Sequence, residues 1–164
     1  MQIEKSEPQK ISGLNESREA MMKLFKCASH KIRWYTPDLD FRISDTSEVY
    51  SRLSEFCRSN PKTNIQILIH DSQSIMRRGH QLIRLFQQLS SSIELRNTHP
   101  DFLKHQPASF IIIDDRHMFF RPLSSQWEGR LIFNNPLMVK NEAKFFKDTF
   151  EMSTPDSQVR SLGI

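Results

Sequence analysis

The sequence is poor in cysteine, in glycine and in long apolar segments. Its two cysteines, Cys27 and Cys57, stand alone without the spacing of a zinc site, which favours reduced thiols and a cytoplasmic location. Only four glycines occur in 164 residues, and they form no phosphate-cradling loop. No apolar run approaches the roughly 18 residues that span a bilayer, and the first residues lack the apolar centre of a secretory signal. These absences predict a cytoplasmic protein without a transmembrane segment, metal or other cofactor.

The excess of positive charge is small. The net charge is +4 and the isoelectric point is about 9.2, with Lys and Arg scattered along the chain. Nucleic-acid-binding proteins usually gather their basic residues on one face, and the sequence alone shows no such cluster. The composition therefore leaves nucleic-acid binding open, while the length of 164 residues predicts one domain.

The predicted helices and strands alternate in the first half of the chain, whereas strands dominate the second half. The predicted strands span residues 31–36, 64–70, 92–96, 109–114, 117–120 and 129–133, and the predicted helices span 17–29, 45–60, 73–89 and 136–150. This order indicates an α/β fold with a mixed sheet between helices. Polar composition predicts a flexible N-terminal arm at 1–13 and a disordered tail at 153–164, leaving a folded domain at 14–152.

Three local signals mark the ends of predicted elements. The stretch Asp45-Thr-Ser-Glu48 has the spacing of a capping box, so Asp45 is expected to cap the helix that follows. Asn135 followed by Pro136 is typical of a helix start. Asp115-Arg116 is a plausible hairpin turn between two strands.

The segment Pro107-Ala-Ser-Phe-Ile-Ile-Ile-Asp-Asp115 resembles an active-site strand whose reactive residues have been replaced. Members of the phospholipase D-like superfamily carry the signature His-x-Lys-x-x-x-x-Asp. Aligned on Asp114, Pro107 stands at the His position and Ser109 at the Lys position, while the apolar filling is kept. The resemblance covers about residues 14–152 and implies one half-domain, a phospholipase D-like α-β-α sandwich with a mixed central sheet.

The replaced residues bear on the chemistry that the resemblance implies. In this family the His attacks phosphorus, the Lys neutralises phosphoryl charge, and two signatures meet, in single-signature members by homodimer formation. Pro107 has no lone pair for attack, and Ser109 carries no positive charge. The Gly-Ser-x-Asn element that usually follows matches only at Ser124. We therefore expect a catalytically inactive homodimeric domain that serves in binding or assembly.

Two alternatives remain open. A remodelled phosphodiesterase or nuclease would use His105 or His99 as a displaced nucleophile. On an extended chain His105 would share a face with Pro107 and Ser109, but about 6 to 7 Å along the strand, too far for the original in-line geometry. The other alternative is a non-catalytic nucleic-acid-binding domain.

A residual cleft that still takes a phosphate-containing ligand would be lined by His105, Ser109, Asp114 and Asn134. The simpler interpretation of Asp114 is that it ends a strand and accepts hydrogen bonds from nearby backbone. Asn134 is expected to face the cleft, beside the capping residue Asn135.

Overall fold

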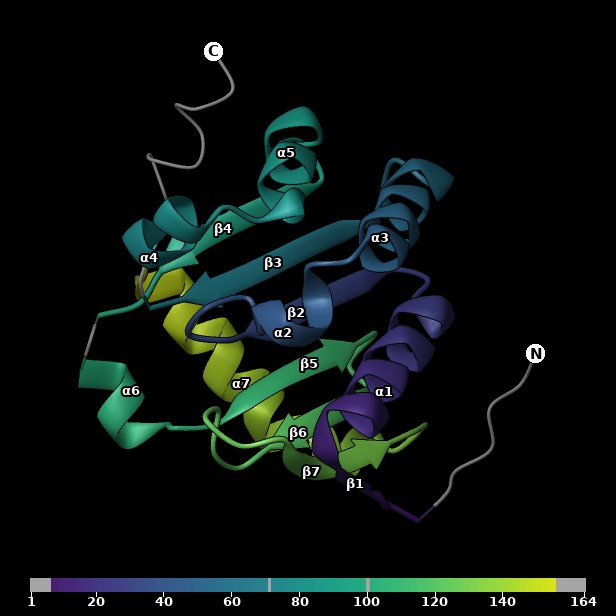
Figure 1. Ribbon diagram of the computed structural model, residues 1–164. Coiled ribbons are helices and arrows are strands. Elements are labelled where there is room, and N and C mark those ends of the chain that lie inside the picture. Colours follow the sequence, from purple (N-terminus) through teal and green to yellow (C-terminus); the bar gives the residue numbers. More distant parts are fainter. Residues whose placement is uncertain (1–6, 71, 100, 156–164) are drawn as a thin grey trace.

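The computed structural model describes residues 7–70, 72–99 and 101–155, and a mixed sheet runs through its centre (Figure 1). The strands are β1 (Gln9–Ser12), β2 (Lys31–Tyr35), β3 (Asn64–Ile69), β4 (Ile93–Asn97), β5 (Ser109–Ile113), β6 (His117–Arg121), β7 (Glu128–Ile132) and β8 (Thr154–Pro155). Within the described chain they lie in the order β1-β7-β6-β5-β2-β3-β4-β8. The pairs β2–β3 and β3–β4 are parallel and the other pairs are antiparallel.

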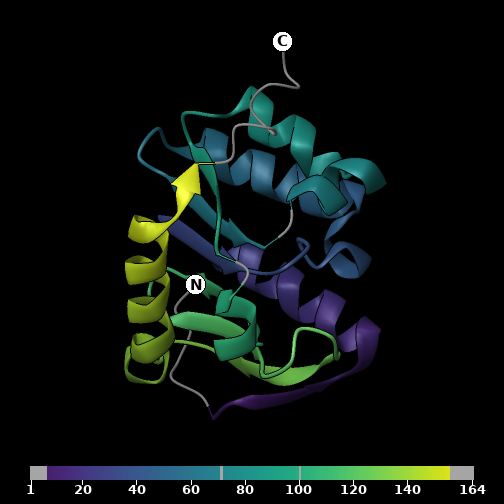
Figure 2. The same ribbon diagram turned by 90° about the vertical axis from the view of Figure 1, so that its left-hand side faces the viewer.

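Helices cover both faces of this sheet, which confirms the predicted sandwich. The longer helices α1 (Gly13–Cys27), α3 (Ser47–Ser59) and α5 (Gln81–Gln88) lie on one face, and α7 (Pro136–Met152) crosses the other (Figures 1 and 2). The short helices α2 (Phe41–Ser44), α4 (Ser72–Arg78) and α6 (Asp101–His105) follow β2, β3 and β4 respectively. Each short helix therefore begins near the carboxyl edge of the three parallel strands.

Two apolar clusters hold the layers together, and β5 contributes to both. Ile111 and Ile113 belong to the cluster under α1, α3 and α5, whereas Phe110 and Ile112 belong to the cluster under α7. Successive side chains of a strand point to opposite faces, so a strand covered on both sides must be apolar throughout. This requirement explains the uninterrupted run Phe110–Ile113.

The prediction of a flexible arm over residues 1–13 is wrong for its last part. Gln9–Ser12 forms β1 and pairs antiparallel with β7, and Ile11 is 3% exposed. Helix α1 then begins at Gly13, whose φ of 88° suits a residue without a side chain. At the other end, Thr154–Pro155 pairs with β4, and the remainder of the predicted tail lies outside the described residues.

The single helix predicted over 73–89 is two helices. Gly79 has a φ of 77°, and the ring Nδ1 of His80 caps α5 by accepting from the Leu82 backbone N–H at 3.1 Å. The predicted cap of α3 is also wrong, because Thr46 accepts from the Val49 backbone N–H. Asp45 instead accepts from the Gln81 backbone N–H at 3.0 Å.

The predicted start of the last helix is confirmed. The Asn135 side chain accepts from the Met138 backbone N–H at 3.3 Å, and Pro136 occupies the first helical position. Between the predicted strands at 92–96 and 109–114, where no helix was predicted, the chain forms helix α6.

Candidate functional site

Ser109, the residue at the Lys position of the signature, is buried at the carboxyl edge of the parallel strands. It begins β5, and since β5 runs antiparallel to β2, it lies beside the end of β2. Ligands of open α/β sheets commonly bind at this edge. The Ser109 hydroxyl lies 3.0 Å from both carboxylate oxygens of Asp40 and 3.2 Å from the Tyr35 carbonyl oxygen. The Ser109 hydroxyl thus forms its hydrogen bonds with groups inside the protein.

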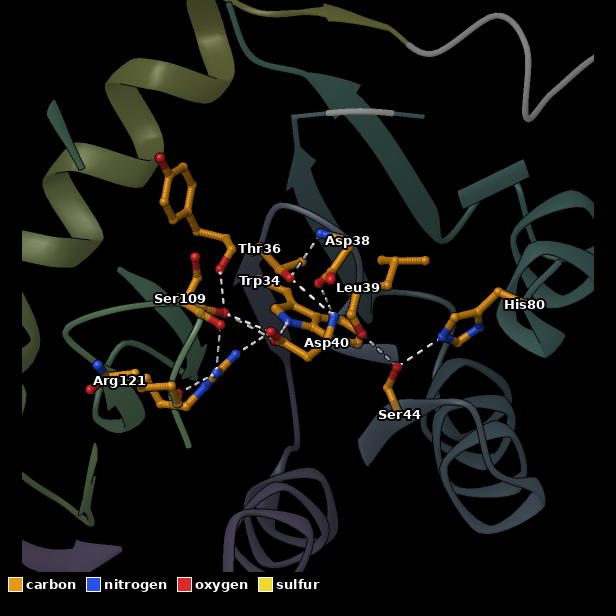
Figure 3. A network of polar contacts seen from close by, with 12 residues as sticks. Trp34, Thr36, Asp38, Leu39, Asp40, Ser44, His80, Ser109 and Arg121 are labelled. Carbon is orange, nitrogen blue, oxygen red and sulfur yellow. Dashed lines mark hydrogen bonds and ion pairs between the residues drawn. The ribbon is translucent and has the colours of Figure 1, made fainter. Parts of the chain in front are cut away.

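Asp40 is the centre of this buried network (Figure 3). Its carboxylate accepts from the Trp34 indole N–H at 2.9 Å and forms an ion pair with Arg121. Asp40 is 4% exposed and Arg121 is 1% exposed. A buried charge is tolerated when it is paired and hydrogen-bonded, and here both conditions are met.

Arg121 ends β6, directly opposite Ser109 in the β5–β6 register. Its Nη1 donates to the carbonyl oxygens of Ser124 at 3.0 Å and Gln126 at 2.8 Å. The guanidinium also stacks over the Trp127 ring, 4.2 Å from its centroid. This guanidinium therefore fixes the β6–β7 loop as well as neutralising Asp40.

The loop that carries Asp40 has an unusual backbone. Leu39 and Asp40 have φ of 64° and 48°, a left-handed conformation that is rare for residues other than glycine. The Asp40 backbone N–H donates to Thr36 Oγ1 at 3.1 Å and to Asp38 Oδ1 at 3.0 Å. Burial, followed by the neighbouring Asp40 carboxylate, raises the pKa of Asp38. Such strain persists where surrounding contacts determine the backbone, and it often marks former or present functional sites.

The geometry of this network limits the chemistry available there. No imidazole contacts Ser109 or Asp40 in the part of the chain that the structure describes. A serine beside a carboxylate is a possible nucleophile, but Ser109 is only 2% exposed. The positive charge of Arg121 is neutralised internally, so it does not face a substrate.

The segment before β5 lies largely on the surface up to Pro107, whereas Ala108 is buried. Pro107, at the signature His position, is exposed, and its carbonyl oxygen accepts from the Ser124 backbone N–H at 2.8 Å. His105 is exposed at the end of α6, so it does not continue the strand as we assumed when we placed it in line with Pro107. His99 is exposed too, and its Nδ1 accepts from the Asp101 backbone N–H at 3.2 Å.

Asp114 lies at the opposite end of β5, about 16 Å from Ser109 by the rise of a strand. Its carboxylate accepts from the backbone N–H groups of Ser29, His30 and Lys31 and from the Ser29 hydroxyl, at 2.8 to 2.9 Å. Burial alone raises the pKa of Asp114, but these hydrogen bonds hold it below its ordinary value. The expectation that Asp114 accepts hydrogen bonds from backbone is confirmed, although these N–H groups lie 83 to 85 positions away in the sequence and not in the adjacent turn.

Asn134 lies at the Asp114 end, not near Ser109. Its φ is 49°, and its backbone N–H donates to His117 Nδ1 at 2.8 Å. His117 pairs with Ile113, the last residue of β5. The structure therefore does not bring Asn134 and Asp114 together with Ser109 and His105.

The sequence analysis missed Asp40 and Arg121, although each left a weak signal. Arg121 ends the otherwise apolar stretch Met118–Phe120, and Asp40 stands between Leu39 and Phe41. A charge inside an apolar segment predicts a buried partner of opposite sign. The sequence did not indicate which partner, since the two residues lie 81 positions apart.

The described residues contain no group of three His, Cys, Asp or Glu side chains that could hold a metal ion. A shallow, mainly apolar depression of about 600 Å³ lies at the start of α7, lined by Asp115, Pro136, Leu137 and Lys140 among others. It lies at the Asp114 end of β5. None of the described helices has the length and apolar character needed to cross a membrane.

Comparisons with known proteins agree with this architecture. A family model described as "Domain of unknown function (DUF7931)" matches residues 13–162, whereas no curated protein matches the sequence. Nuc, a phospholipase D family member from Salmonella typhimurium, superposes with a TM-score of 0.64 at 15% identity, over 92% of this chain and 99% of Nuc. NucT from Helicobacter pylori superposes with a TM-score of 0.62 at 12% identity, over 92% of this chain and 99% of NucT.

A third similar structure is TrmBL2, an archaeal chromatin protein whose structure shows a novel mode of DNA binding. Its TM-score is 0.64 at 12% identity, over 94% of this chain and 55% of TrmBL2. At these identities the likeness concerns the fold, and the fold is that of the phospholipase D family.

Proposed function

Because this chain belongs to the DUF7931 family and has a phospholipase D-like fold, we propose that it is a catalytically inactive domain that serves in binding or assembly. Its two chemical positions hold Pro107 and Ser109, which supply neither a nucleophilic ring nor a positive charge. The domain thus keeps the phospholipase D-like fold and binds its partner or ligand through its surface.

The observation that carries this proposal is that the Ser109 hydroxyl is buried and contacts groups inside the protein. Its hydroxyl contacts the Asp40 carboxylate, and that carboxylate is paired with Arg121. Polar groups of an active site must face substrate, whereas these three side chains are at most 4% exposed. Because the charges of Asp40 and Arg121 compensate each other, this position offers no net positive charge to hold a phosphate.

The proposal also includes a homodimer joined at the carboxyl edge and a location in a bacterial cytoplasm. The dimer is expected from the resemblance, and the exposed apolar residues Pro107, Pro122 and Leu123 lie near Ser109 at this edge. The two separate free cysteines agree with the location. Sedimentation of the wild type and of Leu123→Glu tests the dimer, since a buried glutamate would shift the equilibrium to monomer.

A phosphodiesterase assay at high protein concentration tests inactivity. Substrates are a chromogenic phosphodiester, phosphatidylcholine vesicles and a single-stranded oligonucleotide. The alternative enzyme uses His105 or His99, so the variants are His105→Ala and His99→Ala. His30→Ala is the matched control, because His30 is also exposed but lies beside Asp114 at the other end of β5.

We expect the wild type and all three variants to show the same background hydrolysis. Turnover that disappears in His105→Ala or His99→Ala, but persists in His30→Ala, would establish the alternative enzyme. Turnover lost in Ser109→Ala would reveal instead that the buried hydroxyl reacts.

A further inference from the structure

Helix α7 covers only part of its face of the sheet. It starts over β6 and β7, where Val139 packs with Met118 and Ile132, and it ends at β4, where Arg96 donates to the Phe150 carbonyl oxygen at 2.7 Å. On this face, none of the described helices is seen over the corner where β1, β7 and the end of β6 meet (Figures 1 and 2). The side chains there determine what the corner can bind.

A row of side chains crosses the sheet at this corner. In the strand register Lys10 pairs with Arg130, Arg130 with Phe120, Phe120 with Phe110, and Phe110 with Tyr35. Phe110 and Tyr35 belong to the cluster under α7, so the whole row faces that side of the sheet. Lys10 and Arg130 are exposed and Phe120 is partly buried. We call these three residues the aromatic–basic corner.

The buried ring of Phe110 links Phe120 to further aromatic side chains that are partly exposed. Phe120 stacks on Phe110 with centroids 6.2 Å apart, and Phe110 lies 6.4 Å from Phe145 of α7. Phe145 in turn lies 6.5 Å from Phe102 of α6. Phe120, Phe145 and Phe102 each retain some exposure. Partly exposed rings therefore lie on both sides of the buried Phe110, with Phe120 at the corner and Phe145 toward α6.

The cations of the corner differ from those elsewhere on this face. Lys31 and Arg33 pair with Asp115, and Arg96 pairs with Glu94. Neither Lys10 nor Arg130 has an acidic partner among the described side chains. The nearby Glu128 accepts from the Ser12 hydroxyl at 3.0 Å. Two cations beside partly exposed rings complement a ligand that has both anionic groups and flat apolar faces.

We propose that the aromatic–basic corner binds single-stranded nucleic acid. Phosphates would contact Lys10 and Arg130, and an unstacked base would pack on Phe120. Single strands expose base faces to aromatic side chains on a sheet, whereas a duplex buries those faces in its own stack. This inference rests on the proposed function and names the ligand class of the binding domain.

Fluorescence anisotropy with a labelled single-stranded DNA and a labelled single-stranded RNA of the same sequence tests the assignment. Titrations between about 50 and about 200 mM salt give the salt dependence of affinity. The variants are K10Q/R130Q, which removes both cations, and F120L, which keeps an apolar side chain without a ring. The matched control K23Q/K26Q removes the same charge from exposed positions of α1 on the other face of the sheet.

We expect the wild type to bind at least one probe and F120L to bind about tenfold more weakly. In K10Q/R130Q the slope of log affinity against log salt should shrink by about 1.4, which is two contacts of about 0.7 each. K23Q/K26Q should match the wild type. Circular dichroism checks that each variant is folded, and the two surface substitutions in K10Q/R130Q keep the test valid if F120L is destabilised.

The inference is overturned if neither probe binds at low salt, if K23Q/K26Q loses as much affinity as K10Q/R130Q, or if duplex DNA competes equally. Hydrolysis of the probes is a separate result. Shortened oligonucleotides on a gel would refute the proposed inactivity while leaving the location of the binding surface to be decided by the variants.

Discussion

The two ends of β5 are both organised around an aspartate, but in opposite ways. At the Ser109 end, the Asp40 carboxylate is buried and meets a guanidinium, an indole and a hydroxyl from three different strands. At the other end, the half-buried Asp114 carboxylate is held mainly by consecutive backbone N–H groups of residues 29–31. One end depends on the identity of distant side chains, and the other depends chiefly on the path of the backbone.

This difference separates the structural part of the signature from its chemical part. Asp114 ties the β5–β6 turn to the start of β2, a role that does not involve a substrate. Pro107 and Ser109, which the proposed alignment places at the chemical positions, lie at the other end, where their partners are groups of the protein itself. On that alignment the aspartate of the signature is kept while the reactive positions differ.

Breaking the buried ion pair should have the largest effect. Arg121→Met leaves the Asp40 carboxylate buried without its counter-charge, and removing one partner of such a pair costs about 3 to 5 kcal/mol. Urea unfolding followed by circular dichroism measures the change in the free energy of unfolding.

The matched variants are Asp40→Ala and the double variant D40A/R121M. Since removing both charges leaves neither one unpaired, the double variant should lose less stability than the sum of the single losses. Additive losses would mean that the two side chains do not stabilise the fold as a pair.

Asp114→Asn should have an intermediate effect, about 1 to 3 kcal/mol, because a neutral amide oxygen replaces a carboxylate that accepts several N–H groups. The pKa of Asp114 is lowered in the folded protein, so its contribution is present above the ordinary value of 3.8 and is lost as the pH falls through the lower folded value.

The gap in stability between the wild type and Asp114→Asn should consequently be constant near neutral pH and narrow in acid. Unfolding curves recorded from pH 6 downward give this gap directly. A gap that widens in acid would show that the hydrogen bonds do not favour the charged carboxylate.

The features that the sequence predicts are mainly those that depend on neighbouring residues. The apolar run Phe110–Ile113 and the Asn135–Pro136 helix start depend on local patterns, and both were predicted. That Asp114 accepts backbone N–H groups was predicted as well, but which groups it accepts was not, because residues 29–31 lie 83 to 85 positions away in the sequence. Patterns of neighbouring residues therefore predicted the strand and the helix start, but not the partners of Asp114.

Contacts between residues far apart in the sequence were not predicted. The strand Gln9–Ser12 has one buried apolar residue, Ile11, and its partner β7 lies far along the chain. The periodicity of apolar residues continues across Gly79, so it did not reveal the break between α4 and α5. Asp40 and Arg121 meet only because β6 pairs with β5 and the loop after β2 folds over Ser109.

Removing the hydroxyl group of a serine at each end should have a smaller effect on stability and compares the two ends directly. Ser109→Ala removes a buried donor to a carboxylate and should cost about 1 to 2 kcal/mol. Ser29→Ala removes an exposed donor from Asp114, which keeps its backbone N–H partners, and should cost less. Unfolding curves of the two variants at the same pH compare them, and an equal loss would contradict the distinction between the two ends.

Each end of β5 is also supported by a neutral histidine. His80 Nε2 lies 2.8 Å from the Ser44 hydroxyl, which donates to the Leu39 carbonyl beside Asp40, and His80 Nδ1 accepts from Leu82. His117 Nδ1 accepts from the Asn134 N–H near Asp114. A ring nitrogen that accepts a backbone N–H must be unprotonated, so both histidines are neutral in the folded protein.

Acidification should therefore lower the free energy of unfolding in the pH range where the free histidine side chain gains its proton. Burial lowers the pKa of His80 and of His117 below the ordinary value of 6.5, although Asp45 and Asp114 respectively act in the opposite direction. Their stabilisation is complete above pH 6.5 and is lost as the pH falls through the lower folded values.

The wild type should be less stable at pH 5 than at pH 7, and His80→Gln and His117→Gln should each reduce that difference. The reduction should be greater for His80, whose side chain is only 1% exposed. A wild type that gains stability on acidification would contradict the neutral state of both rings.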